Sequence, residues 1–223
     1  MRYYLYIIKP ALVLLLAVLT VYCGYGKVDN YVLTSLTLTV VFMTAAGCVV
    51  NDYFDVKIDH LVRPEYQIVT RKISRDGAMH YFYGLTVAAV FFGLVTAWFA
   101  ESFTIAGMAI VVPGLLWFYS SSYKRVLILG DVVLSLVVAL IPVVIAIVAN
   151  TYQAYVLMAC RSLQMLLGSL ICLQFVAIDQ QAGDREMEVH TLAVVWGKKV
   201  TKIVIGVLCV FFLVATALAV ANS

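Results

Sequence analysis

The sequence predicts an all-α protein that crosses a lipid bilayer several times. Hydrophobic residues occupy 64% of its 223 positions and charged residues only 12%, and the mean hydropathy is +1.02. Soluble domains carry about 25% charged residues, so this composition indicates a membrane protein. The apolar residues come in long runs, and roughly 20 of them in a helix span a hydrocarbon core about 30 Å thick. We therefore expect one transmembrane domain over residues 1–223.

Seven apolar runs are long enough to form membrane-spanning helices. They cover residues 5–25, 31–52, 78–100, 103–120, 129–149, 153–178 and 200–221. Arg2 and Lys9 precede the first run, as basic residues precede the apolar part of a signal peptide. Signal processing requires small residues near the cleavage site, and Val21 and Tyr22 are too bulky for it. The first run is therefore expected to remain as a helix.

The loops between these helices differ in charge. All 15 lysines and arginines except Lys27 and Arg161 fall on the side of the N-terminus and of the loops after the second, fourth and sixth helices. Lysine and arginine accumulate in cytoplasmic loops of membrane proteins. The pattern predicts an integral membrane protein with a cytoplasmic N-terminus.

A polar stretch, residues 51–59, ends the second apolar run. On a helix, its amide and carboxylates recur at spacings of three and four residues, so they share one face; they are Asn51, Asp52, Asp55 and Asp59. Negative charge at the edge of hydrocarbon is costly unless a cation or hydrogen-bond donors compensate it. Oxygen ligands on one face suit Mg²⁺, which keeps several waters and bridges to substrate phosphates. The alternative is a solvated helix end whose acids pair with Lys57, Arg63 and Arg71.

The sixth helix brings a second polar group to the same side of the membrane, namely Asp179, Gln180 and Asp184. Two basic segments, residues 63–72 and 119–125, lie on that side as well. Acids that hold Mg²⁺, together with lysines and arginines that neutralise phosphate, form the combination required for diphosphate binding. Basic residues at a cytoplasmic helix end usually only set topology, which is the alternative for Lys124 and Arg125.

Other classes of protein are less consistent with this sequence. The five cysteines all lie inside apolar runs, without the spacing of disulfides or zinc sites. The dispersed basic residues give no support for nucleic-acid binding. A cation transporter is another possibility, because acids within a membrane often mark ion paths. Transporters carry such residues near the middle of the membrane, whereas these acids lie at helix ends on one side.

The pattern NDxxDxxxD at residues 51–59 resembles the first aspartate-rich motif of the UbiA superfamily of intramembrane prenyltransferases. Residues 63–64 resemble the family's loop after that motif, and residues 119–125 its connection between helices 4 and 5. Residues 183–192 and 195–197 resemble the segment after the second motif. This last stretch is most similar to the branch that adds geranylgeranyl to geranylgeranylglyceryl phosphate. The resemblance runs from about residue 5 to the end of the chain.

The resemblance implies a helical bundle, usually of nine helices, around a central cavity that opens near the cytoplasmic side. It implies an enzyme of a prokaryotic inner membrane that transfers an isoprenyl group from an isoprenyl diphosphate to a lipophilic acceptor. Mg²⁺ would be the cofactor, and diphosphate would be released.

Residue roles follow from the same resemblance. The implied Mg²⁺ ligands are Asn51, Asp52, Asp55, Asp59, Asp179 and Asp184. The implied diphosphate-binding residues are Arg63, Arg71, Lys72, Lys124 and Tyr119. Of these, Asp55, Asp184 and Lys124 would be catalytic.

The sequence departs from the family pattern in three places. The second motif is usually DxxxD, but Gln180 stands four residues before Asp184. Tyr119 and Lys124 are further apart than the family spacing, and seven helices are expected where nine are usual. Gln180 and the missing helices support a second hypothesis, a non-catalytic member of the fold that binds a prenyl lipid or a partner protein. The leading hypothesis remains a Mg²⁺-dependent prenyltransferase.

Overall fold

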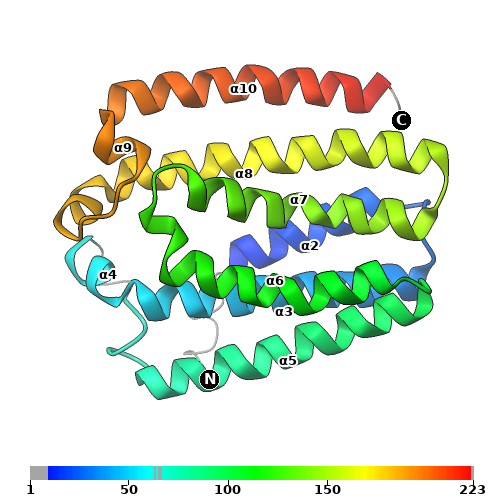
Figure 1. Cartoon of the computed structure of the whole chain (residues 1–223), viewed down its shortest axis with the longest axis horizontal. Coiled ribbons are helices and arrows are strands. Elements are labelled where there is room, and N and C mark those ends of the chain that lie inside the picture. Colours follow the sequence, from blue (N-terminus) through cyan, green and yellow to red (C-terminus); the bar gives the residue numbers. More distant parts are fainter. Residues whose placement is uncertain (1–9, 63, 65–66, 222–223) are drawn as a thin grey trace.

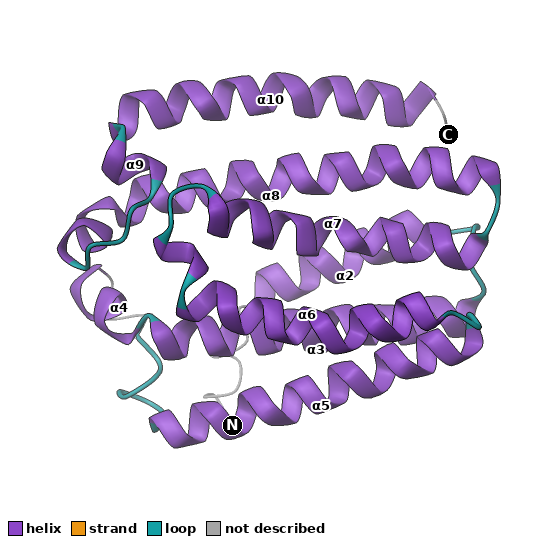
Figure 2. Cartoon of the chain, viewed as in Figure 1, coloured by secondary structure: helices purple, strands orange, loops and turns teal. Residues whose placement is uncertain are grey.

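The protein is an all-helical bundle, as expected. A computed structural model describes residues 10–62, 64 and 67–221. Every regular element over these residues is helical, apart from one isolated β-bridge between Val69 and Ile73 (Figure 2).

Each expected apolar run forms a helix. The seven long helices are α2 (Pro10–Gly24), α3 (Asn30–Phe54), α5 (Arg75–Phe99), α6 (Phe103–Ser121), α7 (Leu129–Ala149), α8 (Tyr152–Glu186) and α10 (Gly197–Ala221). Among the described residues, six of them are long and apolar enough to cross a membrane. The exception is α2, whose described apolar part, Leu15–Gly24, is shorter.

Three short helical elements lie at one end of the bundle. They are α4 (Val56–Val62), the 3-10 turn η1 (Tyr123–Arg125) and α9 (Leu192–Val195). Figure 1 shows α4 and α9 together at this end, beside the turn that joins α6 to α7. The chain returns through short turns at the opposite end. The longer connections therefore gather where the sequence places its acidic stretches.

Two helix boundaries differ from the sequence-based expectation. Helix α8 does not end at residue 178 but continues to Glu186, and its 35 residues measure roughly 52 Å at 1.5 Å per residue. The last turns of α8 therefore carry the second polar group beyond the apolar core of the bundle. The expected continuous helix through residues 51–59 is wrong, because the helix is interrupted at Asp55, where α3 ends and α4 has not begun.

The interruption at Asp55 is small. Its backbone lies at φ −88° and ψ 4°, in the sparsely populated bridge region. The Asp55 N–H still donates to the carbonyl of Asn51 at 2.9 Å, and the Asp59 N–H donates to the carbonyl of Asp55 at 2.8 Å. The chain therefore changes direction at Asp55 without leaving these backbone groups unpaired.

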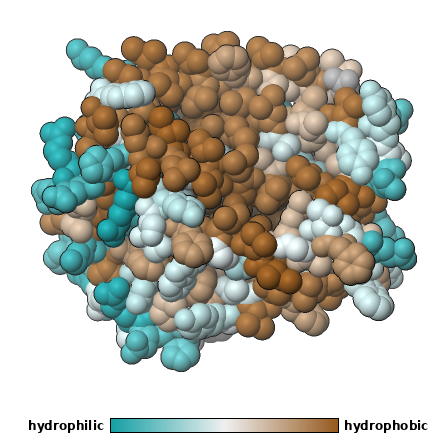
Figure 3. Space-filling model, in the orientation of Figure 1, coloured by the Kyte–Doolittle hydropathy of each residue, from teal (hydrophilic) through white to brown (hydrophobic). Residues whose placement is uncertain are grey.

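Apolar packing and a few short polar contacts hold the long helices together. Buried hydrophobic side chains from α2, α3, α5, α6, α7 and α8 form the largest core cluster of the described residues. Thr96 of α5 donates to the hydroxyl of Ser35 of α3 at 2.9 Å, and Ser162 of α8 donates to the carbonyl of Ala139 of α7 at 2.7 Å. Figure 3 shows hydrophobic residues over the middle of the visible face and hydrophilic residues at its two ends. This distribution is that of a membrane-embedded bundle.

Candidate active site at the charged end of the bundle

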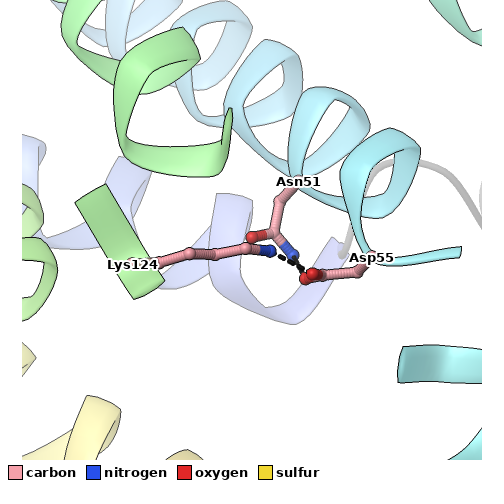
Figure 4. A network of polar contacts seen from close by, with 3 residues as sticks. All are labelled: Asn51, Asp55 and Lys124. Carbon is pink, nitrogen blue, oxygen red and sulfur yellow. Dashed lines mark hydrogen bonds and ion pairs between the residues drawn. The ribbon is translucent and has the colours of Figure 1, made fainter. Parts of the chain in front are cut away.

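Asp55 is the residue on which two elements converge. Its carboxylate accepts a hydrogen bond from Asn51 Nδ2 at 2.8 Å and forms an ion pair with Lys124 Nζ. Figure 4 shows the Asn51 and Lys124 side chains meeting the same carboxylate from α3 and from η1. The side chains of Lys124 and Asp55 are only 12% and 11% exposed. Each oxygen of Asp55 thus has its own donor in a largely dry environment.

The position of Lys124 depends on a tight backbone contact with the start of α7. A Cβ atom added at Gly130 would lie 2.6 Å from Lys124 Cα and 2.8 Å from both Lys124 N and Tyr123 O. Backbone atoms cannot yield as a flexible side chain can, so only glycine fits here. The glycine lets η1 rest directly on α7.

The turn before Gly130 is strained. Ile128 has φ 65° and ψ −35°, and the Leu129 N–H donates to the carbonyl of Leu127 at 2.7 Å, which closes a three-residue turn. A β-branched residue at positive φ is uncommon and costs free energy. Such strain often accompanies functional sites, and here it lies next to the segment that presents Lys124.

Asp184 approaches the same region from the last turns of α8. It is 4% exposed and accepts a hydrogen bond from the Thr191 hydroxyl at 3.3 Å. The His190 N–H donates to the carbonyl of Arg125 at 3.2 Å, which ties the loop after α8 to η1. The charges of Asp55 and Lys124 both act on Asp184. The two acidic stretches therefore belong to one electrostatic cluster.

Tyr119 lies within this cluster. It is near the end of α6, and its phenol interacts electrostatically with Asp131, Asp55 and Asp184. The structure thus brings five side chains from α3, α6, η1 and α8 to one end of the bundle, namely Asn51, Asp55, Tyr119, Lys124 and Asp184.

The other residues expected at the site are placed differently. Asp52 is buried and Asp59 is half-buried, and both interact with other groups of the protein. Asp179 is exposed on α8. Arg71 and Lys72 are exposed on the turn after α4, where the Arg71 guanidinium donates to the carbonyl of Pro64. Arg63 lies outside the described residues.

Sequence-based reasoning missed Asp131 and Gln174. Asp131 lies in the first turn of α7, and its carboxylate accepts a hydrogen bond from Gln174 Nε2 of α8 at 2.7 Å. Its charge also acts on Asp184. A signal was available, because Asp131 is the single ionisable residue in the apolar run 129–149. Ionisable residues within membrane helices are usually functional.

The oxygen donors of this cluster suit a Mg²⁺ ion that is coordinated jointly by the protein and by the substrate. Among residues 10–62, 64 and 67–221, no three Asp, Glu, His or Cys side chains are arranged so that they could hold a metal ion. The cluster nonetheless holds two carboxylates near one lysine: Asp55 pairs directly with Lys124, and the charge of Lys124 also acts on Asp184. Mg²⁺ typically takes one or two protein carboxylates, several waters and substrate phosphates. This donor set suits such a shared site.

Comparison with known proteins gives consistent results. The model of the UbiA prenyltransferase family matches residues 11–223. The digeranylgeranylglyceryl phosphate synthase of Methanobrevibacter smithii is 27% identical over 92% of this chain and 72% of its own length. The synthase of the same name from Methanothermobacter thermautotrophicus is 29% identical over 98% of this chain and 74% of its own length.

Solved structures show the same fold. A UbiA homolog from Archaeoglobus fulgidus bound to GPP and Mg²⁺ has a TM-score of 0.77 and 14% identity, over 99% of this chain and 78% of that one. The structure of a digeranylgeranylglyceryl phosphate synthase has a TM-score of 0.70 and 18% identity, over 96% of this chain and 75% of that one. At these identities the likeness concerns the fold alone.

Proposed function

The chain belongs to the UbiA prenyltransferase family, and from this membership we propose that it transfers an isoprenyl group from an isoprenyl diphosphate to a lipophilic acceptor and releases diphosphate. The carrying observation is the joint cluster of Asp55, Lys124 and Asp184, which three separate elements contribute to one end of the bundle. A membrane enzyme that ionises an allylic diphosphate requires compensating charge at such a place.

The acidic side chains supply the oxygen ligands. Asn51, Asp55 and Asp184 would hold Mg²⁺ together with the diphosphate, and the neighbouring acids Asp52, Asp59 and Asp179 would assist. When bound, Mg²⁺ neutralises the charge that develops on the departing diphosphate. The donors of Asn51 and Thr191 hold the Asp55 and Asp184 carboxylates in fixed orientations. Such fixed orientations are needed because a misplaced ligand loses affinity.

Lys124 has two alternative anionic partners in this scheme. Its ammonium pairs with Asp55 in the structure. With Asp55 engaged as a Mg²⁺ ligand, Lys124 would be released from this pair and would donate to a phosphate oxygen. A buried ammonium without an anionic partner is costly, so the exchange keeps its charge compensated in both states. Tyr119 would donate its hydroxyl to the diphosphate from α6.

The exposed basic turn after α4 serves a different purpose. Arg71 and Lys72 lie near the surface, and with Arg63 they would attract the diphosphate and contact its outer oxygens. Exposed basic groups accelerate association more than they add affinity. The excess of lysine and arginine in the loops at this end supports a cytoplasmic orientation, and a soluble or membrane-bound isoprenyl diphosphate would then arrive from the cytoplasm.

For the substrates, we propose a geranylgeranyl donor and a prenylated glyceryl phosphate as acceptor. The names of the two similar synthases from Methanobrevibacter smithii and Methanothermobacter thermautotrophicus support this choice, as does the stretch 183–192.

The test uses the whole protein in lipid nanodiscs. With Mg²⁺, geranylgeranyl diphosphate and geranylgeranylglyceryl phosphate, we expect diphosphate release and a product that carries both prenyl chains, identified by mass spectrometry. Chelation of Mg²⁺ should abolish both signals. Binding of geranylgeranyl diphosphate without turnover, under all acceptor conditions, would favour the non-catalytic alternative that Gln180 suggests.

A further inference from the structure

Arg161 lies in the apolar part of α8, far from the candidate active site. It is the only lysine, arginine, aspartate or glutamate in residues 152–178. It precedes Asp184 by 23 residues in the unbroken helix α8, which separates the two by roughly 35 Å along the axis. A charged residue within a membrane helix is costly to place there and usually has a function. At this distance, the function of Arg161 is separate from that of the charged cluster.

Three helices hold the Arg161 side chain in one direction. Its Nη1 donates to Gln164 Oε1 at 3.1 Å, and Gln164 Nε2 donates to the hydroxyl of Thr216 in α10 at 2.9 Å. The guanidinium carbon lies 4.7 Å from the centre of the Tyr22 ring in α2. Such preorganisation lowers the entropy that a ligand must lose on binding. The guanidinium is therefore already oriented before any ligand arrives.

The charge of Arg161 has neutral neighbours. Among the described residues, no carboxylate forms an ion pair with it, and its two contacts are an amide oxygen and an aromatic ring. A guanidinium carries five N–H donors and stays protonated in proteins. The side chain is partly exposed, so its remaining donors are accessible. Phosphate is a group that accepts two of them at once.

An open groove along α2 begins beside this charge. Its volume is about 490 Å³, within the range of roughly 300–1,000 Å³ that is usual for ligand sites. The described residues that line it are Ala17, Val18, Val21, Tyr22 and Tyr25. Tyr22 belongs to this lining and also contacts the guanidinium. The groove is therefore largely apolar and has a cation at its edge.

The guanidinium lies near the membrane surface opposite the charged cluster. Figure 1 shows the end of α2 and the beginning of α8 together at that end of the bundle. Exposed tyrosines gather there, as they do at the level of lipid headgroups; they are Tyr22, Tyr25, Tyr31, Tyr152 and Tyr155. From Tyr25 to Ala17 the groove extends roughly 12 Å along α2 toward the middle of the bundle. It thus runs from the headgroup level into hydrocarbon.

A single molecule with an anionic head and an apolar chain satisfies both features. A soluble anion would pair with Arg161 and leave the groove empty, whereas a neutral lipid would fill the groove and leave the charge unpaired. We propose that Arg161 binds the phosphate of an anionic phospholipid and that one chain of this lipid lies in the groove along α2. The prenyl acceptor does not suit this site, because its reacting group would have to lie at the charged cluster. The inference does not depend on the proposed prenyl transfer.

Photolabelling of the whole protein tests the site. The protein is placed in phosphatidylcholine nanodiscs that contain a small fraction of either phosphatidylglycerol or phosphatidylcholine with the same photoreactive chain. The readout is the label on the peptide that carries residues 17–25, expressed as the ratio between the two lipids. Because the chains are identical, this ratio reports only the preference for the anionic headgroup. It requires no substrate and no turnover.

For wild type we expect phosphatidylglycerol to label this peptide at least about tenfold more than phosphatidylcholine, as one charged hydrogen bond would provide. Arg161→Met removes the charge and keeps an unbranched side chain, and the two lipids should then label equally. Lys27→Met is the matched control, because Lys27 is exposed in the turn after α2 at the same end. It should change the ratio by less than about twofold, since exposed charges contribute little.

Val21→Trp tests the groove with the charge intact. Val21 is exposed on α2, so the larger ring can occupy the groove without disturbing the core. We expect the preference for phosphatidylglycerol to be lost in this variant as well. If Arg161→Met does not fold, this variant decides the matter, and a wild-type ratio in Val21→Trp overturns the proposal. Equal labelling by both lipids in wild type, or an unchanged ratio in folded Arg161→Met, also overturns it.

Two further measurements separate the lipid from other occupants. Millimolar inorganic phosphate should leave the labelling by phosphatidylglycerol unchanged, because it cannot fill the groove. Full competition by inorganic phosphate would show a simple anion site and would contradict the proposal. If wild type forms a dimer in the nanodiscs and neither lipid labels residues 17–25, a second copy of the chain covers the groove and the proposal is wrong.

Discussion

At the scale of single residues, the proposed chemistry depends on charge compensation around Asp55. Asn51 and Lys124 each donate to one of its oxygens in a site that excludes most water. Electrostatic interactions are stronger in such surroundings than at the surface. Substitution of Asn51 or Lys124 should therefore change diphosphate binding more than a similar substitution at the protein surface.

Lys124→Met should weaken the binding of geranylgeranyl diphosphate by about 10- to 100-fold, the range expected when one charged hydrogen bond is lost. Lys57→Met is the matched control, because Lys57 is exposed on the neighbouring helix α4. It should change the affinity by less than about threefold. Titration of both variants with the unreactive analogue geranylgeranyl thiodiphosphate checks this, and similar losses in the two would argue against a specific role of Lys124.

Gln180→Asp should tighten Mg²⁺ binding in the presence of diphosphate. The new carboxylate would stand one helical turn before Asp184 on the same face of α8, where two carboxylates can share a cation. The comparison variant is Asp179→Ala, which removes an exposed carboxylate one residue earlier. Diphosphate release measured across a Mg²⁺ titration compares the two variants. If Asp179→Ala abolishes release while Gln180→Asp has no effect, Asp179 supplies the ligand instead.

At the scale of elements, the turn between α6 and α7 positions the lysine. Gly130 touches the backbone of Lys124, and Ile128 adopts a left-handed conformation just before it. The short helix η1 has no buried residue, so its position against α7 depends strongly on this close backbone contact. A substitution that changes the geometry of this turn should therefore also change the rate of prenyl transfer.

Gly130→Ala should destabilise the protein by about 1–3 kcal/mol through overpacking and should reduce turnover, because η1 must move away from α7. Gly114→Ala in α6 is the control, since nothing lies within 4 Å of a Cβ at that position. Alanine is a better helix former than glycine, so this control should be neutral or slightly stabilising. Thermal unfolding and diphosphate release test both. Full activity of Gly130→Ala would show that the turn does not set the position of Lys124.

At the scale of the whole molecule, the two ends of the bundle differ in charge and in the length of their connections. The described end with α4, η1 and α9 carries the acidic cluster and most of the basic residues, whereas the other end has short turns. The asymmetry predicts the orientation in the membrane as well as the side from which diphosphate enters.

Cysteine labelling tests this orientation. Lys72→Cys should react with a membrane-impermeant reagent only from the cytoplasmic side, and Lys27→Cys only from the opposite side. Lys72 is exposed after α4, and Lys27 is exposed in the turn after α2. Labelling of Lys27→Cys from the cytoplasmic side would contradict the proposed topology.

The sequence by itself determined the class of fold and the end of the molecule that carries the site. Apolar runs of sufficient length have few alternatives to membrane helices, because unpaired backbone groups are too costly in lipid. The seven helices accordingly lie close to their expected positions. The spacing of Asn51 and Asp55 within one turn also predicted their contact, since residues four apart on a helix are neighbours.

Only the tertiary structure decided which residues from different helices meet. Sequence spacing describes one helix at a time and says nothing about how that helix is rotated against its neighbours. Lys124 rather than the nearby Lys57 pairs with Asp55, because Gly130 lets η1 approach. The same long-range packing turns Asp179 outward, brings Asp184 beside Lys124, and joins Asp131 to Gln174 across α7 and α8. These contacts depend on helix rotation and crossing, which no local pattern encodes.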